Sequence, residues 1–261
     1  ASWISPLFYF LGVFAVIGSG LMLKKTKLFA GRPTPFVMEL PAYHFPAIRS
    51  WALHVWERCW AFIKKAGTVI FASTVVVWFL SNFGSYNGAF GFLPAMEGIP
   101  EEFMDYSVLA MLGNLVAWIF APLGFSTWQA TALTVSGLVA KENIVGTMGI
   151  LYPDGWTEIG AAFTQISGYS FLVFNLLCAP CFAAIGAIKR EMNNAKWTWF
   201  AIGYQCGFAY AIALMVNQFG ALFTGNGNVL GVIVGVVLLA FIVYMLVKPY
   251  KEATKLTAKI K

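Results

Sequence analysis

Long runs of apolar residues dominate this chain and limit what it can fold into. A helix that crosses a bilayer needs about 20 mostly apolar residues, and only helices or closed barrels satisfy their backbone groups in lipid. The alternation typical of a membrane barrel is absent, so the sequence predicts an all-α polytopic membrane protein. About seven transmembrane helices are expected, at residues 3–23, 65–82, 106–121, 127–151, 168–188, 197–219 and 228–247.

The charged residues are few, at 11% of the 261 positions, and they divide between alternate loops. Basic side chains gather in residues 24–65, in the 189–196 loop and after Pro249, whereas loops 81–105 and 152–167 carry acids and no basic residue. The positive-inside rule makes the basic side cytoplasmic. We therefore expect an outward N-terminus and a cytoplasmic C-terminus. The net charge of +6 then reflects this bias and contact with anionic lipid, not nucleic-acid binding.

The chain divides into four predicted parts. Ala1 opens directly into the first apolar stretch without an initiator methionine, which indicates a fragment of a longer protein. The parts are a first transmembrane helix at 1–24, a cytoplasmic connector and helix at 25–65, a transmembrane core at 66–247 and a basic cytoplasmic tail at 248–261.

Two of the loops have a composition that predicts their structure. Residues 32–46 are rich in proline, which forbids a long helix. After Pro46, apolar and basic residues fall on opposite sides of a helical wheel, which predicts an amphipathic helix lying in the cytoplasmic interface. The Gly- and Asn-rich start of loop 81–105 predicts irregular structure.

The sharpest intramembrane polar cluster is Asn175-Leu-Leu-Cys178-Ala-Pro180-Cys181. Cysteines at i and i+3 project from neighbouring positions on one helical face, with Asn175 a turn earlier. Pro180 lacks a backbone donor and leaves a carbonyl without its usual partner. Two thiols, a free carbonyl and an amide oxygen suit a borderline or soft divalent metal. Alternatively, the cysteines are apolar packing or a redox dithiol.

Two further clusters are candidate pore residues. Lys141 and Glu142 are adjacent and therefore do not pair well on a helix. Glu142 is a candidate oxygen ligand or proton carrier and Lys141 a counter-ion; alternatively, this segment breaks or re-enters near an interface. Gln205 and Cys206 are the last candidates. Interhelical hydrogen bonds are the simplest explanation for the polar residues of 197–219, but Cys206 adds a sulfur if it faces Cys178.

Several of these segments resemble ferrous iron transport protein B. Phe36-Val-Met-Glu-Leu-Pro-Ala-Tyr43 is similar to that family's connector, although Ala42 replaces a typical proline. Gly137-Leu-Val-Ala-Lys141-Glu142 resembles its Ala-Lys-Glu segment, and residues 168–191, with Cys178-Ala-Pro-Cys181, resemble its second Gate motif. The similarity extends over about residues 30–255.

The resemblance implies the membrane permease part of a ferrous iron importer in the bacterial inner membrane, with a periplasmic N-terminus for this chain. Cys178 and Cys181 would then be pore contacts for Fe²⁺, the transported substrate. A GTPase domain and first Gate region precede this part in the family, so GTP and Mg²⁺ would act only through that domain. No resident cofactor and no enzymatic activity are expected of the chain itself, and no phosphate-binding loop occurs in it. Small accessory proteins and a homo-oligomer are further partners consistent with the family.

Three alternatives stay open. Related nucleoside-recognition membrane domains carry organic solutes, which would require Asn175, Gln205 and Asn217 to converge in one cavity. A membrane thiol–disulfide electron carrier would use Cys178 and Cys181. The chain could also serve as a scaffold for an upstream cytoplasmic domain.

Overall fold

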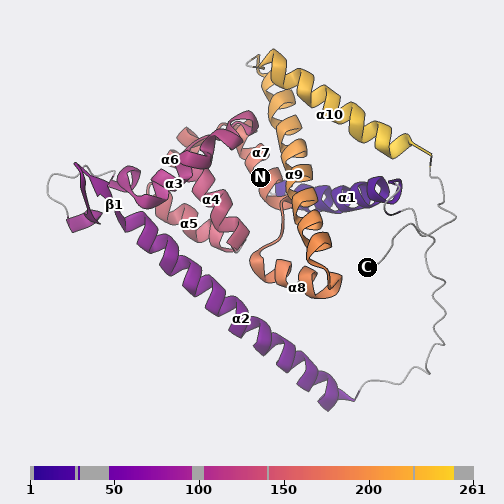
Figure 1. Cartoon of the computed structure of the whole chain (residues 1–261), viewed down its shortest axis with the longest axis horizontal. Coiled ribbons are helices and arrows are strands. Elements are labelled where there is room, and N and C mark those ends of the chain that lie inside the picture. The colour runs from indigo at the N-terminus through magenta and orange to yellow at the C-terminus, as the bar shows by residue number, and fades with distance from the viewer. Residues whose placement is uncertain are drawn as a thin grey trace. The chain divides into compact units, whose positions relative to one another are not determined.

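The fold of the chain is seen in a computed structural model, which describes residues 3–26, 29, 47–95, 103–139, 141–225 and 227–249 (Figure 1). The chain divides into two compact units. We call residues 65–236 the core unit, and residues 1–64 with 237–261 the terminal unit. The predicted connector at 32–46 and most of the basic tail lie outside the described residues.

Helices make up most of the described chain, and the predicted all-α class is confirmed. The sheet found among the described residues is one small two-stranded hairpin. The α-helices are α1 (Ile4–Lys24), α2 (Ile48–Asn82), α3 (Val108–Ala117), α4 (Trp128–Val139), α5 (Asn143–Leu151), α6 (Trp156–Ala162), α7 (Gln165–Leu177), α8 (Phe182–Met192), α9 (Ala195–Phe223) and α10 (Val229–Val247). The shorter elements are β1 (Phe83–Tyr86), β2 (Ala89–Phe92) and the 3₁₀ turns η1 (Leu93–Ala95), η2 (Phe103–Tyr106) and η3 (Trp118–Leu123).

Three helices in the described part of the chain are long and apolar enough to cross a membrane: α1, α9 and α10. A fourth span results if the pair Val108–Leu123 and Trp128–Val139, bent by 94°, counts as one. The predicted spans 127–151 and 168–188 are helical but interrupted, at Lys141-Glu142 and at residues 178–181. Seven uninterrupted spans are therefore not found among the described residues. The interruptions fall where the sequence places charge or proline inside an apolar run.

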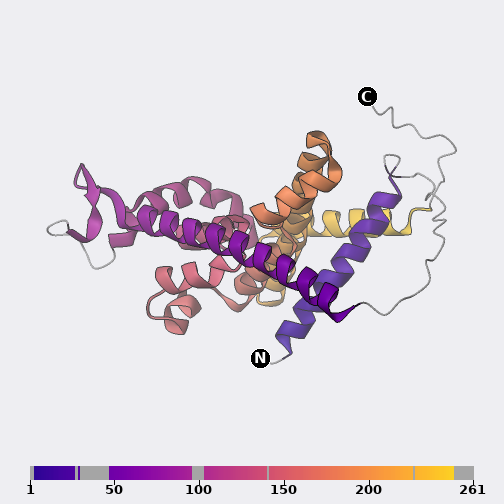
Figure 2. The ribbon, with the colours of Figure 1, turned by 90° about the horizontal axis from the view of Figure 1, so that it is seen from below.

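Two predictions about local structure were wrong. The amphipathic helix after Pro46 and the span at 65–82 form one 35-residue helix, α2, because no proline separates them. The start of loop 81–105 is an ordered antiparallel hairpin that continues directly from α2 (Figure 2). Its turn is Asn87-Gly88, and both residues have positive φ, at 50° and 83°. This Asn-Gly pair is the preferred type I′ hairpin turn, a signal that composition alone hides.

Packing in the core unit centres on α4 and on the α7–α9 pair. Most of α4 is buried, and α7 packs along much of α9. The two helices approach closely where a Cβ on Gly220 would meet Ile166. The Ser170 hydroxyl joins them by donating to the Ala213 carbonyl at 2.9 Å. Around them, large apolar side chains remain exposed, as expected for a surface that faces lipid.

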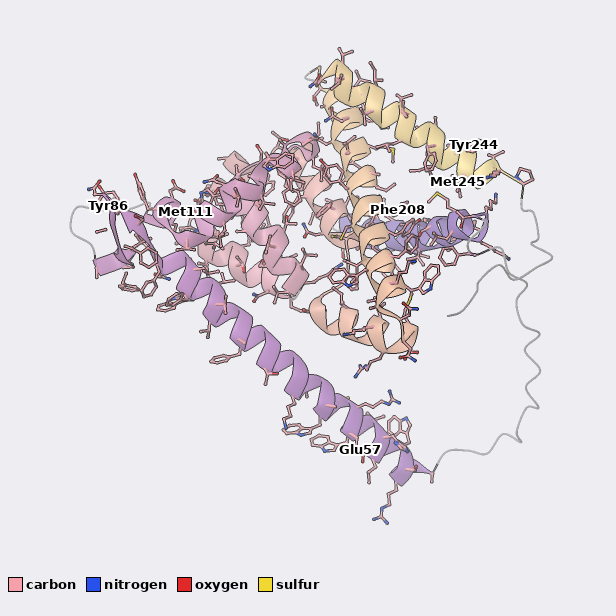
Figure 3. All side chains as sticks on the ribbon, viewed as in Figure 1. Glu57, Tyr86, Met111, Phe208, Tyr244 and Met245 are labelled. Carbon is pink, nitrogen blue, oxygen red and sulfur yellow. The ribbon has the colours of Figure 1, made fainter. Side chains whose placement is uncertain are left out.

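The same exposure holds for α10, whose residues from Val237 onward belong to the terminal unit. Its side chains, Tyr244 among them, point away from the helix axis on all sides (Figure 3), and Tyr244 is 60% exposed. The Lys25 ammonium, just beyond the end of α1, donates to the Leu246 carbonyl near the end of α10. The C-terminal ends of these two apolar helices therefore meet.

Candidate functional site

The segment Cys178–Cys181 is not helical. Cys178 ends α7 with ψ of 164° and Cys181 precedes α8 with ψ of 159°, so both have extended backbone. Pro180 explains the break, because it cannot donate to a preceding turn and it pushes Ala179 out of the helical region. The expectation that Cys178 and Cys181 share one helical face was therefore wrong. They flank the gap between two helix ends.

Cys178 turns toward α9. Its sulfur lies 3.6 Å from the sulfur of Cys206, and Cys178 is buried whereas Cys181 and Cys206 are partly exposed. All four cysteines of the chain are free thiols. Cys206, the candidate for a further sulfur, thus faces Cys178, and the sulfur pair joins the α7–α8 break to the neighbouring helix.

Lys141 belongs to a second break, between α4 and α5. Its ammonium donates to the carbonyl oxygens of Asn175 and Leu176, at 2.9 and 3.3 Å. In a continuing helix, Leu176 would receive its hydrogen bond from residue 180, which here is proline. A cation at the C-terminal end of a helix is also favoured by the helix dipole. Lys141 therefore caps the broken end of α7, a partnership that no spacing in the sequence indicated.

The remaining predicted residues lie around these two breaks. The Asn175 amide nitrogen donates to the Phe171 carbonyl within α7 at 2.9 Å. A Cβ on Gly137 would meet Ile144 and come within 3.3 Å of the Asn175 amide oxygen, which shows how closely α4 approaches α7. Glu142 is exposed immediately before α5. The structure thus bears out the alternative in which the 127–151 span breaks at Lys141-Glu142.

Gln205 lies beside Cys206 on α9. Its side-chain oxygen is buried without a hydrogen-bond partner among the described residues. Three other polar residues of α9 serve the interhelical role expected of them. Tyr210 donates to the Ile119 carbonyl at 2.7 Å, and the amides of Asn217 and Gln218 donate to the Pro122 carbonyl at 3.1 and 2.8 Å. These bonds fix η3 against α9.

Metal ligands at this site would come from sulfur and backbone oxygen. Within the described part of the chain, no three His, Cys, Asp or Glu side chains are grouped as a metal site. The Cys178 and Cys206 thiols and the carbonyls that end α7 are the available donors. This set is suited to a transient contact with a borderline divalent ion, and it lacks the ligands of a closed structural site.

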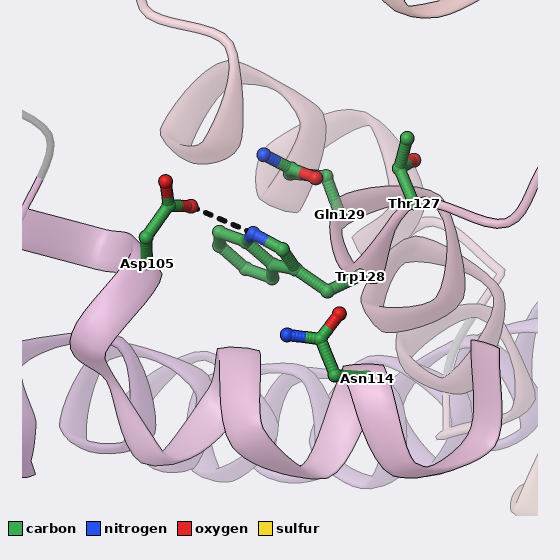
Figure 4. A pocket seen from close by; sticks show the side chains of 5 residues that line it. All are labelled: Asp105, Asn114, Thr127, Trp128 and Gln129. Atoms are coloured by element: carbon green, nitrogen blue, oxygen red, sulfur yellow. Dashed lines mark hydrogen bonds between the residues drawn. The ribbon is translucent and has the colours of Figure 1, made fainter.

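A second polar feature, which no sequence motif indicated, is an open pocket of about 440 Å³ lined by Asp105, Asn114, Thr127, Trp128 and Gln129 (Figure 4). The Trp128 indole donates to an Asp105 carboxylate oxygen at 2.7 Å. Asp105 comes from η2, Asn114 from α3 and Gln129 from α4. The packing of η2 and α3 against α4 brings them together, so no motif could have revealed the pocket.

Tyr152 follows the end of α5 and was also not anticipated. It is buried, and burial raises the pKa of its phenol to about 12, with the nearby Glu158 charge acting in the same direction and the Thr127 hydroxyl in the opposite one. The phenol therefore stays neutral at physiological pH.

The helix breaks at Lys141-Glu142 and at residues 178–181 lie in a part of the chain that matches a known protein family. The family model described as "Nucleoside recognition", or Gate, matches residues 63–195, just over half of the 261 residues. The model described as "Ferrous iron transport protein B C terminus" matches residues 6–58. The chain belongs to the ferrous iron transport protein B family. Both breaks fall inside its Gate region.

Individual relatives agree with this assignment. The Fe(2+) transporter FeoB of Staphylococcus aureus (strain COL) is 36% identical over 219 residues, which cover 82% of this chain and 31% of the relative. That of Methanocaldococcus jannaschii is 33% identical over 218 residues, covering 82% of this chain and 32% of the relative. The chain thus spans about a third of the length of these relatives. No solved structure is significantly similar to it.

Proposed function

We propose that this chain is the membrane permease part of a ferrous iron importer and that Fe²⁺ passes through a gate at the α7–α8 break. The observation that carries the proposal is the break itself, which lies between α7 and α8 and is joined to α9 where the Cys178 and Cys206 sulfurs lie 3.6 Å apart. Cys181 stands at the other side of the gap. Helix breaks with unpaired backbone groups are where many transporters bind their substrates.

The chemistry of the donors supports transient iron binding. Ferrous iron accepts thiolate as well as oxygen ligands, and a site that conducts must hold its ion weakly enough to release it. The site offers two facing thiols and carbonyl oxygens instead of a complete cage. Asp105 and the acidic loops would attract the hydrated ion on the periplasmic side.

Location and partners are part of the same proposal. The basic loops would lie in the cytoplasm of a bacterial cell, with the membrane-spanning helices in the inner membrane. A GTPase domain elsewhere in the protein would drive or gate the passage. One relative, from Porphyromonas gingivalis, is named a fusion of Fe(2+) transport protein A and Fe(2+) transporter FeoB; it is 29% identical over 256 residues. An accessory protein of that kind is therefore a proposed partner.

The test replaces Cys178 and Cys181 together by serine in the complete protein and measures uptake of radioactive Fe²⁺ by cells. Uptake should be lost while the amount of protein in the membrane stays unchanged. Cys59→Ser is the matched control, since Cys59 is an exposed thiol on α2 outside the break, and it should transport normally. Normal uptake by the double variant would remove the metal role of these thiols.

A second candidate is a membrane thiol–disulfide electron carrier, which the closeness of Cys178 to Cys206 favours. In that case alkylation followed by mass spectrometry would trap a disulfide or mixed disulfide at Cys178 in membranes of growing cells. The solute-carrier alternative has less support, because the Asn175 and Asn217 amides are engaged with backbone carbonyls of different segments.

A further inference from the structure

The end of α7 presents an unusual combination of acceptors and donor. The carbonyls of Asn175 and Leu176 belong to the last turn of the helix, and Pro180 cannot donate to Leu176 as the next turn of a continuing helix would. Both oxygens instead accept from one ammonium, that of Lys141, at 2.9 and 3.3 Å. Two carbonyl oxygens converging on one positive charge are the elements of a cation site.

A charged donor is not needed merely to satisfy these carbonyls. At Pro122 the same core unit faces the same problem, because in the 3₁₀ turn η3 the proline would have donated to Ile119. There the neutral phenol of Tyr210 supplies the bond at 2.7 Å. A neutral side chain on α9 is thus sufficient to cap a proline break in this molecule.

Lys141 is, moreover, held without a compensating acid. In the part of the chain that the structure describes, its ammonium contacts these two carbonyls and no carboxylate. The adjacent Glu142 is exposed. Lysine also has a flexible four-carbon stem and a strongly hydrated head, and Lys141 extends from the non-helical junction between α4 and α5. The Lys141 ammonium can therefore leave the carbonyls that it caps.

We propose that the Asn175 and Leu176 carbonyls form a binding site for a divalent metal cation and that Lys141 is a tethered cation occupying it in the resting protein. An entering metal ion displaces the ammonium, takes the two oxygens and gains the Cys178 sulfur as a further ligand. The proposal rests on the proposed function for the identity of the ion. In this arrangement the Lys141 ammonium competes with the metal ion and keeps the site occupied until a doubly charged ion displaces it.

The first experiment measures Co²⁺ binding, because Co²⁺–thiolate absorption reports the sulfur contact directly. The protein would be studied in lipid nanodiscs under anaerobic conditions as wild type, Lys141→Met and Lys141→Arg. If Lys141 fills the site about nine-tenths of the time, its removal should tighten the apparent Kd about tenfold. Lys141→Arg keeps the charge and should bind like wild type. Lys189→Met is the matched control, since Lys189 is an exposed lysine at the end of α8, and it should also bind like wild type.

A second measurement follows the ammonium itself. Lysine acylation with peptide-resolved mass spectrometry should show Lys141 reacting several-fold faster when Co²⁺ is bound, while Lys189 reacts at one rate throughout. This readout needs only the folded wild-type protein, so it does not depend on the stability of a variant.

The outcomes separate the two proposals. Tighter binding by Lys141→Met with metal-induced exposure of Lys141 supports the tethered cation. Equal or weaker binding by Lys141→Met, or an unchanged acylation rate in metal-loaded wild type, overturns it and leaves Lys141 as a helix cap. If Cys178→Ser abolishes Co²⁺ binding in that case, the proposed gate still stands. Absence of Co²⁺–thiolate absorption in every variant overturns both.

Discussion

Pro122 and Pro180 interrupt helices of the same unit, yet the carbonyls they leave free find different kinds of donor. Ile119, freed by Pro122, accepts from the phenol of Tyr210. Leu176, freed by Pro180, shares the ammonium of Lys141 with Asn175. Both solutions satisfy backbone oxygens that would otherwise be costly in an apolar environment.

The donors differ in how firmly they are held. Tyr210 lies within the 29-residue helix α9, and Asn217 and Gln218 reinforce the same attachment by donating to the Pro122 carbonyl. Gly124 ends η3 with φ of 87°, and a Cβ there would collide with the Asn217 side chain. By contrast, Lys141 is a long side chain at a junction between two short helices. The break at Pro122 is therefore held rigidly against α9, whereas the break at Pro180 is suited to open.

The largest difference between the two breaks should come from replacing each proline. Pro180→Ala supplies the missing donor to Leu176 and lets α7 run on, which would draw Cys178 and Cys181 into a helix. Iron uptake by the complete protein should then fall about tenfold or more, whereas Pro122→Ala should stay within about twofold of wild type because η3 remains attached to α9. Uptake of radioactive Fe²⁺, normalised to membrane protein, measures both. Equal losses of iron uptake in the two variants would contradict the proposed difference between the breaks.

The second prediction concerns the fixed break. Tyr210→Phe removes the donor to Ile119 without a change of shape, so the carbonyl is left unsatisfied and the free energy of unfolding should fall by about 1 kcal/mol. Denaturation in mixed micelles gives this value. The exposed Tyr244 provides the control, and Tyr244→Phe should be neutral. Co²⁺ binding should be unaffected by Tyr210→Phe; a loss there would mean that the two breaks are coupled.

A smaller effect on iron uptake is expected from Asp105, which lines the pocket at the start of α4. Asp105→Asn removes the charge in the pocket, so the initial rate of iron uptake at low ionic strength should fall about threefold. Asp105→Glu keeps the charge and should retain the rate. Raising the salt concentration should shrink the difference, because exposed charges are screened. A salt-independent deficit would point to lost packing of Trp128 instead.

The smallest expected effect is on the free energy of unfolding at alkaline pH, and it concerns Tyr152. The pKa of Tyr152 is raised to about 12 by burial, so the unfolded chain ionises this phenol first, near its ordinary pKa of about 10. The contribution of Tyr152 to stability is complete below about pH 10 and is lost as the pH rises toward 12. Tyr152→Phe should remove that part of the decline in unfolding curves between these values. An unchanged decline would assign it to other groups.

Much of the fold followed from local pattern. The apolar runs predicted helices at the right places, because a segment of that length in lipid must satisfy its own backbone. Prediction failed at two boundaries: Asn87-Gly88 makes an unexpected hairpin, and α2 continues through the boundary expected before residue 65. At the site, residue types were predicted but most contacts were not. Cys178 was expected on one helical face with Cys181; it instead faces Cys206, a contact that the sequence offered only as a condition.

The sequence by itself determined that this is an α-helical membrane protein, that its family is that of ferrous iron transport protein B, and that Pro180 lies between two cysteines within an apolar run. Those properties depend on composition and on neighbouring residues. Only the tertiary structure decided which groups meet: Lys141 with the carbonyls of α7, Cys178 with Cys206, and Asp105 with Trp128. Each pair joins residues 23 to 35 positions apart in the sequence, and the packing of helices, which no local pattern encodes, brings them together.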